Sequence, residues 1–183
     1  MYLKKFATLF FQDCKGKNIL DLGCGTSNIL KFIFKQQSKV NFSYLGIDTS
    51  KKYVEYAKKK FPACMYLNQS VCEQIDINME FDIVISLAVM AALCDEDLKK
   101  MFSVIRSKVN KNTKIILSDM NYRENAQGFE KFLYKNERNS YVRGEQDYIK
   151  VLSEFFEIEK IYYWDKVYRI PYSKVIFECR LKD

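Results

Sequence analysis

One short apolar run that breaks into two glycines constrains this chain more than any other stretch. Residues 18–22 (Asn-Ile-Leu-Asp-Leu) have the apolar character of a buried parallel strand, and Gly23 and Gly25 follow immediately. Behind them, apolar side chains recur at helical spacing: Ile29, Leu30, Ile33 and Phe34. The pattern predicts a strand, a tight turn and a helix. Glycines in such a turn let the backbone approach a ligand, and free N–H groups at the helix start attract polar or anionic groups.

The turn therefore predicts a site for a nucleotide-like ligand. The alternative is an ordinary β–α turn in which the two glycines are incidental. Glycine is scarce in this chain, with 6 in 183 residues, so two in one turn favour the ligand site. The strand and helix on either side supply the context that a phosphate- or nucleotide-binding glycine fingerprint requires.

The motif Asp21-Leu22-Gly23-Cys24-Gly25-Thr26 resembles motif I of the class I S-adenosylmethionine (SAM)-dependent methyltransferases. The resemblance implies SAM as the cofactor and a position for Asp21 that faces the methionine part of SAM. One departure is Ser27, since a further glycine is common there; serine is small, so we expect the turn to survive. The resemblance assigns cofactor contacts to this loop, namely Asp21, Gly23, Cys24, Gly25, Thr26 and Ser27.

The next predicted strand, residues 42–48, ends in a carboxylate. Asp48 lies 25 residues after Gly23, close to the spacing of about 20 at which a ribose-binding acid follows a glycine turn. A carboxylate there accepts hydrogen bonds from both ribose hydroxyls and repels a 2′-phosphate, which argues against NADP. The phrase 46–50 resembles motif II of the family, and Thr49 is included among the expected cofactor contacts. Asp48 could instead cap the following helix, a task open also to Thr49 or Ser50.

The resemblance implies an adenine contact after the third strand, predicted at residues 63–67. The family usually has an acid there that accepts a hydrogen bond from the adenine amino group. This chain has Asn68 and Gln69, and either side-chain carbonyl can accept the same bond.

Residues 81–87 predict a central strand that resembles motif IV. Ser86 and Leu87 lie at its carboxyl end, where ligands bind in open α/β sheets, so both are expected to contact the cofactor. The DNA amino-methyltransferase signature, Asn/Asp-Pro-Pro-Tyr/Phe, is absent, and an apolar segment at 88–93 is interpreted as a lid. In the family, such a segment is often found in enzymes that act on small molecules.

The whole chain is interpreted as one class I methyltransferase domain, residues 1–183. The expected fold is α/β and Rossmann-like, with a seven-stranded, mostly parallel sheet, helices on both faces and an antiparallel C-terminal edge pair. That edge pair is predicted at 156–164 and 174–181, and an N-terminal helix at 2–13. A polar, aromatic insert at about 120–150 is expected on the substrate side.

Methyl transfer from a sulfonium needs mainly alignment and desolvation, because the leaving group is neutral. The chain has no histidine, so the usual histidine base is excluded. The candidate catalytic groups are Asp119, Tyr122 and Tyr141. Arginine binds carboxylate or phosphate in bidentate geometry, and the candidate substrate contacts are Arg123, Arg143, Tyr148 and Arg169. Any one of these residues could instead be a solvated surface residue or a packing tyrosine.

The formal net charge of +7 is compatible with an anionic partner such as RNA, or with the lysine-rich composition that an AT-rich coding sequence produces. The six cysteines show no metal-binding spacing, so we expect no metal and a reducing, cytoplasmic location. No run has transmembrane length, and no membrane partner is expected.

The favoured function is SAM-dependent transfer of a methyl group to oxygen or nitrogen of a small polar or anionic molecule. An RNA or protein methyltransferase, or a non-catalytic SAM-binding subunit, is the alternative. An NAD-dependent oxidoreductase is disfavoured because its fingerprint requires a third glycine where this chain has Asn28. The sequence leaves the acceptor and the oligomeric state open.

Overall fold

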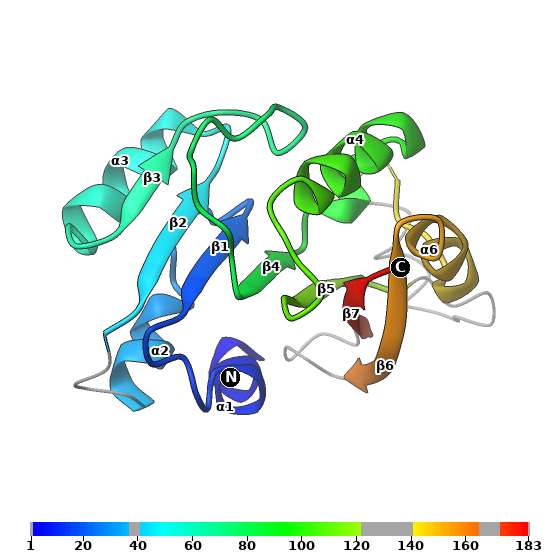
Figure 1. Ribbon diagram of the computed structural model, residues 1–183, viewed down its shortest axis with the longest axis horizontal. Coiled ribbons are helices and arrows are strands. Elements are labelled where there is room, and N and C mark those ends of the chain that lie inside the picture. The colour runs from blue at the N-terminus through cyan, green and yellow to red at the C-terminus, as the bar shows by residue number, and fades with distance from the viewer. Residues whose placement is uncertain (1, 37–40, 122–140, 165–172, 183) are drawn as a thin grey trace, which may run out of the picture.

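The computed structural model describes residues 2–36, 41–121, 141–164 and 173–182. Seven strands form one sheet in the order β3-β2-β1-β4-β5-β7-β6 (Figure 1). The five strands β1 to β5 run parallel, and β7 is antiparallel to both β5 and β6. The predicted fold class is confirmed. The strands are β1 (Asn18–Leu22), β2 (Ser43–Ile47), β3 (Met65–Leu67), β4 (Ile83–Leu87), β5 (Lys114–Met120), β6 (Phe156–Trp164) and β7 (Lys174–Leu181).

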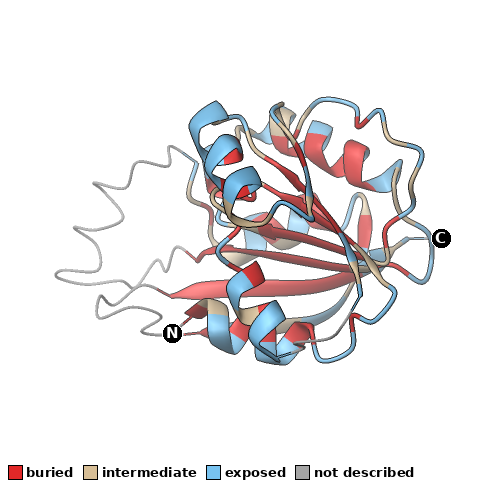
Figure 2. Ribbon diagram, turned by 90° about the vertical axis from the view of Figure 1, so that its left-hand side faces the viewer, coloured by how far each residue is buried: buried red, intermediate tan, exposed pale blue. Residues whose placement is uncertain are grey.

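Helices cover both faces of the sheet, because parallel strands bury side chains on both sides. In β1, Ile19 packs with the helices α1, α2 and α3, whereas Leu20 and Leu22 pack with α4 and α6. Buried positions therefore line the inner side of every helix (Figure 2). The helices are α1 (Tyr2–Phe10), α2 (Leu30–Gln36), α3 (Lys51–Lys60), α4 (Asp95–Arg106) and α6 (Glu145–Leu152), and a short 3-10 turn, η1, spans Met90–Ala92.

The α4 helix shows how the sequence makes these elements. Leu98, Met101, Phe102 and Ile105 recur at helical spacing and are fully buried against the sheet. Three acidic residues occupy its first turn, where negative charge complements the helix dipole. No helix among the described residues is long and apolar enough to span a bilayer.

One predicted segment differs from the structure at the carboxyl end of β4. Next to it, pairing with β7 continues β5 through Asp119 and Met120. The apolar segment 88–93, predicted as a lid, folds into η1, with Met90 and Ala91 fully buried. It is held there because the Ala91 N–H donates to Asp119 Oδ2 at 2.9 Å.

Candidate cofactor site

The glycine turn is fixed to the end of β2 by its own backbone. The N–H groups of Gly23 and Cys24 both donate to the carbonyl of Ile47, at 2.8 and 2.9 Å. Gly23 has a φ of +73°, and a β-carbon there would lie 2.2 Å from Val89 Cγ2. Any side chain would therefore collide with the segment that follows β4. The turn has this close approach because Gly23 has no side chain.

A cavity of about 390 Å³ opens beside this turn, within the range of about 300–1,000 Å³ that small-molecule sites occupy. It lies at the carboxyl ends of β1 and β4, where open α/β sheets bind ligands. A β-carbon on Gly25 would meet no atom within 4 Å, so this part of the turn faces open space. The lining residues are Leu3, Asp21, Gly23, Cys24, Gly25, Thr26, Asn28, Ile29, Tyr53 and Leu87.

Asp21 supplies the carboxyl group of the cavity. The residue is buried, and the Tyr44 hydroxyl donates to its Oδ2 at 2.5 Å; the same hydroxyl lies 3.1 Å from Ser27 Oγ. Burial raises the pKa of Asp21 to about 7, although the hydrogen bond from Tyr44 acts in the opposite direction; the nearby charge of Asp48 raises it further. A cationic ligand group beside this carboxyl would favour its ionised form.

Asp48 fixes the turn from the second strand. Its Oδ2 accepts the Gly25 N–H at 2.8 Å, and its Oδ1 accepts the Ser50 N–H at 2.8 Å. A carboxylate oxygen has two lone pairs, so each oxygen retains the capacity to accept a ribose hydroxyl. The side chain that caps α3 is Ser50, which accepts the Tyr53 N–H.

The two amides predicted to contact adenine lie after β3. Asn68 is exposed and donates its amide group to the carbonyls of Asp48 and Thr49, at 2.9 and 2.8 Å. This places Asn68 beside the Asp48 turn, with Thr49 also exposed. Gln69 turns back toward its own loop and donates to the Gln74 carbonyl at 3.2 Å.

The other predicted contacts divide between the two faces of the sheet. Leu87 lines the cavity, but Ser86 is its neighbour in β4, and successive side chains of a strand point to opposite faces. The buried Ser86 side chain therefore lies on the α4 face, away from the cavity. Cys24 and Thr26 line the cavity, whereas Ser27 is fully buried below the turn with a φ of +50°, the conformation that favours glycine.

The donor set fits SAM. Asp21 offers a carboxylate to a positively charged methionine end, and Asp48 can accept ribose hydroxyls. The open space beside Gly25 leaves room for the ligand against the turn. Each of these features belongs to a different residue of the predicted contact set, and the fold brings them to one edge of the sheet.

The candidate base Asp119 lies inside the protein. It is fully buried, Oδ2 accepts the Ala91 N–H at 2.9 Å, and Oδ1 accepts the Met120 N–H at 2.7 Å. Burial raises the pKa of Asp119, while the charge of Lys174 lowers it. The residue is not among those that line the cofactor cavity. Its contacts assign it to holding η1 against β5.

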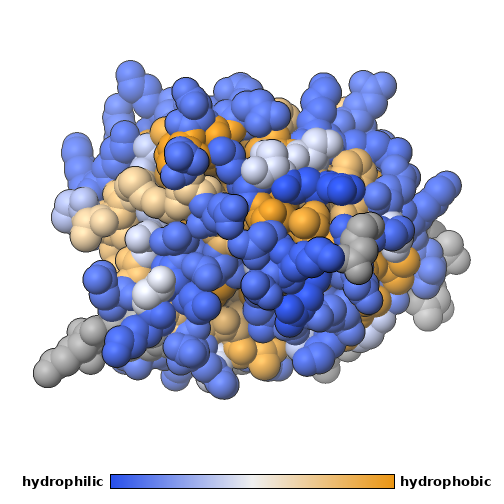
Figure 3. All heavy atoms as spheres, in the orientation of Figure 1, coloured by the Kyte–Doolittle hydropathy of each residue, from blue (hydrophilic) through white to orange (hydrophobic). Residues whose placement is uncertain are grey.

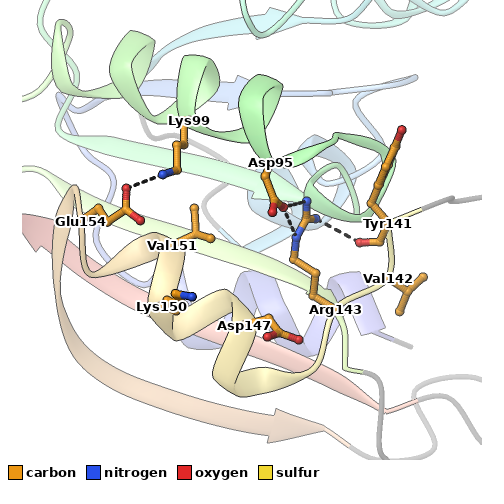
Figure 4. Close-up of a pocket in the computed structure, with 9 residues that line it drawn as sticks. All are labelled: Asp95, Lys99, Tyr141, Val142, Arg143, Asp147, Lys150, Val151 and Glu154. Carbon is orange, nitrogen blue, oxygen red and sulfur yellow. Dashed lines mark hydrogen bonds and ion pairs between the residues drawn. The ribbon is translucent and has the colours of Figure 1, made fainter.

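Arg143 was predicted to bind substrate, but its guanidinium is used within the protein. It makes two hydrogen bonds with Asp95 Oδ1 and donates to the Tyr141 carbonyl (Figure 4). It also donates to the carbonyls of Met90 and Leu93. These bonds account for all five N–H groups of the side chain. With only 8% of its surface exposed, Arg143 therefore clamps η1 and the start of α4.

The other described candidates lie around Arg143. Tyr148 is fully buried in α6, with its ring under the guanidinium at 5.9 Å, so it packs rather than meeting solvent. Tyr141 is 46% exposed, and its N–H donates to the Ala91 carbonyl at 3.0 Å. Three candidates, Tyr122, Arg123 and Arg169, lie outside the described residues.

A second cavity, of about 440 Å³, opens between α4 and α6 (Figure 4). Charged side chains dominate its walls, and several of them pair with one another. Lys99 Nζ lies 2.7 Å from Glu154 Oε2, and Arg143 binds Asp95. It is separated from the glycine turn by the sheet, because α4 and α6 cover the opposite face.

Sequence reasoning missed Tyr44, the buried hydrogen-bond partner of Asp21. The strand register explains this contact: Asp21 pairs with Gly46, and Tyr44 lies two residues earlier on the same face of β2. It also missed Leu3 and Tyr53 as lining residues, because their distance from the cavity depends on how α1 and α3 pack, and it missed Asn28, which follows the glycine turn.

The cysteines and acids form no metal centre in the described part of the chain. No group of three or more Cys, Asp or Glu side chains is close enough there to hold an ion. All six cysteines are free thiols, and Cys14, Cys24 and Cys179 are buried.

Comparisons with known proteins identify the family and the fold. A family model described as a methyltransferase domain matches residues 13–173. A comparison with curated proteins finds no match. A TehB-like SAM-dependent methyltransferase from Corynebacterium glutamicum has a TM-score of 0.71 at 18% identity, over 100% of this chain and 89% of that one.

Two further solved structures share the fold. A SAM-dependent methyltransferase from Clostridium acetobutylicum has a TM-score of 0.71 at 14% identity, over 100% of this chain and 93% of that one. The magnesium protoporphyrin IX methyltransferase from Synechocystis, solved with bound S-adenosylhomocysteine (SAH), has a TM-score of 0.71 at 20% identity, over 97% of this chain and 80% of that one. At these identities the likeness establishes the fold.

Proposed function

Because the chain belongs to the methyltransferase-domain family, whose enzymes use SAM, we propose that it methylates oxygen or nitrogen of a small polar or anionic molecule. The observation that carries the proposal is the cavity that joins Asp21 to the glycine turn. A buried carboxyl at the wall of such a cavity selects a cationic ligand group, and SAM has two of these in its methionine part.

When bound, SAM supplies a methyl group on a positively charged sulfur. The residues of this chain would hold and align it: Asp21 at the methionine end and Asp48 at the ribose. The low dielectric around Asp21 strengthens its attraction for a cation relative to water. Alignment is the main contribution expected of the protein, since the leaving group is neutral.

The acceptor follows from what the chain lacks and from where its polar groups lie. With no histidine and with Asp119 buried, an acceptor that needs little deprotonation, such as a carboxylate or a neutral amine, suits this site. Arg143 and Tyr148 are committed to packing, so the proposal of an anionic acceptor rests on Arg123 and Arg169. Of the candidate hydroxyl groups, Tyr141 is exposed and Tyr122 remains a prediction.

We further propose a single domain over residues 1–183 and a cytoplasmic location. One continuous sheet, which includes strands from near both ends of the chain, supports the first proposal. Six free thiols support a reducing compartment, where cysteines stay unpaired.

Calorimetric titration of the purified chain with SAM, SAH and NAD tests the cofactor site. SAM and SAH should bind, NAD should not, and Asp48→Ala should weaken SAM about tenfold or more, because it removes the acceptors for two ribose hydroxyls. Asp76→Asn, at an exposed acid in the loop before β4, is the matched control and should leave the affinity unchanged. Binding of NAD alone would overturn the proposal.

Transfer of a radioactive methyl group from SAM tests the acceptor. A cell extract separated into small molecules, RNA and protein should give label in the small-molecule fraction. Label in RNA or protein would support the corresponding alternative, and SAM binding without turnover on any fraction would indicate a non-catalytic subunit.

A further inference from the structure

The positive charge of this protein is concentrated on two neighbouring helices. Together α2 and α3 contain seven lysines and one acidic residue, Glu55, which accounts for nearly all of the formal net charge of +7. No described carboxylate forms an ion pair with any of these lysines. The α4 helix differs: three acids balance three basic residues, and Lys99 and Lys100 pair with Glu154 and Asp97.

The two helices form one surface. The Lys60 ammonium donates to Asn28 Oδ1 at 3.0 Å, just before α2 begins. Phe61, after α3, packs on Phe34 of α2 with ring centroids 6.0 Å apart. Burial and the nearby positive charge of Lys31 both lower the pKa of Lys60, so the two lysines lie close together. Adjacent lysines of this kind are stabilised when an anion lies between them.

Two tyrosines stand on this basic surface. Tyr53 is 49% exposed and Tyr56 is 52% exposed, which is unusual for large aromatic side chains that could be buried. With Lys60 they are spaced i, i+3 and i+7, so the three residues form a stripe along one side of α3. Lys60 lies over the Tyr56 ring at 5.2 Å.

The stripe of Tyr53, Tyr56 and Lys60 begins at the cofactor cavity. Tyr53 lines that cavity, and at the other end Lys60 binds Asn28, which also lines it. Asn28 in turn donates to Thr26 Oγ1 at 2.9 Å, within the glycine turn. A ligand bound along the stripe would therefore lie beside the cofactor.

We propose that α2 and α3 form a binding surface for single-stranded nucleic acid, with successive bases stacked on Tyr53 and Tyr56 and phosphates bound by the surrounding lysines. Positive grooves interleaved with aromatic rings are how proteins bind single strands without reading their sequence. The inference concerns binding and stands apart from the identity of the methyl acceptor.

An anionic membrane would attract the same lysines but would need an apolar face on the helix. In α3 the two buried residues, Val54 and Ala57, face the sheet, and the exposed face carries lysines and tyrosines. On the side of the molecule seen in Figure 3, hydrophilic side chains predominate and hydrophobic ones form small, separate areas. These features favour nucleic acid over lipid.

Fluorescence anisotropy with a fluorescein-labelled, 12-nucleotide single-stranded RNA of mixed sequence tests the proposal, with the full chain and no cofactor. Binding is expected at 50 mM salt and should weaken as salt rises, since each phosphate contact contributes about −0.7 to the log–log slope. Tyr56→Ala should weaken binding about tenfold, within the range for one lost stacking contact. The double variant Lys52→Gln/Lys59→Gln should reduce the steepness of the salt dependence.

The matched control is Lys99→Gln/Lys100→Gln, which removes the same charge from α4 and should change the affinity less than twofold. Thermal unfolding of each variant checks that the fold is intact. No RNA binding at 50 mM salt would overturn the proposal. So would equal binding of duplex RNA with no effect of Tyr56→Ala, or binding to phosphatidylserine vesicles without binding to RNA.

Discussion

Asp21 and Asp119 are both buried acids near the carboxyl ends of parallel strands, yet they lie in opposite kinds of surroundings. Asp119 accepts backbone N–H groups on both oxygens and is absent from the cofactor cavity. Asp21 has one side-chain donor, Tyr44, and faces that cavity. Burial raises the pKa of both. A raised pKa therefore shows only that an acid is buried, whereas a carboxyl group that opens onto a cavity can bind a ligand.

The two acids should differ most in how much they contribute to the stability of the fold. Asp119→Ala leaves two buried N–H groups, of Ala91 and Met120, without acceptors, and we expect the free energy of unfolding to fall by about 3 kcal/mol. Urea denaturation measures this, with Asp76→Ala, at an exposed acid in the loop before β4, as the control, which should change the free energy of unfolding by less than about 0.5 kcal/mol. A variant that stays stable but loses methyl transfer would restore Asp119 as the general base.

Asp21→Asn should separate the acids in the opposite sense, by weakening cofactor binding while the fold persists. Asparagine has the same shape and its carbonyl still accepts the Tyr44 hydroxyl. Loss of the negative charge should weaken SAM roughly 10–100-fold, the value of a charged hydrogen bond. SAH lacks the sulfonium, so its affinity should fall less; calorimetry with both ligands measures the difference. Equal losses for SAM and SAH would show that Asp21 does not sense the sulfonium.

Cofactor affinity should also depend on pH through Asp21. With a pKa of about 7, this carboxyl is mostly ionised at pH 8 and mostly protonated at pH 6. SAM affinity should therefore fall about tenfold from pH 8 to pH 6, following the ionised fraction. Calorimetry across this range measures it, and Asp21→Asn should flatten the profile.

The stability of the cofactor-free protein should respond to Asp21 with the opposite sign. The pKa of an unfolded aspartate is near 3.9, so between pH 4 and 7 the folded state binds more protons than the unfolded state. The contribution of Asp21 to stability therefore rises as pH falls through this window. Thermal unfolding of wild type and Asp21→Asn over the same pH range separates this contribution from the other titrating groups.

The smallest effect should come from Tyr44, whose hydrogen bond lowers the pKa of Asp21. Tyr44→Phe removes a donor that lowers the pKa of Asp21, so the pH midpoint of SAM binding should move upward. Loss of one buried hydrogen bond should cost about 1 kcal/mol of stability. Tyr162→Phe removes a similar bond, to Glu178, on β6 and should leave the midpoint in place. An unchanged midpoint in Tyr44→Phe would assign Tyr44 to packing alone.

The strands and the glycine turn could be predicted because their causes are local. Apolar runs, the two glycines and the acid at position 48 are visible in the sequence, and the C-terminal strands match the predicted bounds, 156–164 and 174–181. The sequence could not show that Val89 leaves no room for a side chain on Gly23, because Val89 follows a different strand.

The roles of Arg143, Asp119 and the segment 88–93 could not be predicted, because they depend on partners far away in the sequence. Arg143 has the residue type for anion binding, but its N–H groups are used by carbonyls about 50 residues away. The apolar segment 88–93 has the composition of a lid, but contacts with Asp119 and Arg143 hold its Met90 and Ala91 in the core, while Ala88 and Ala92 are exposed.

The sequence by itself determined the α/β architecture, because the spacing of its apolar residues is a local property. SAM as the cofactor, and Asp21, Gly23, Gly25 and Asp48 as its expected contacts, followed from the resemblance of two motifs to the class I methyltransferases. Only the tertiary structure decided which acid opens onto the cavity, that Tyr44 partners it, and that the lysines of α2 and α3 share one surface. Those facts depend on which side of each strand and helix faces which neighbour, and that is set by packing between elements far apart in the chain.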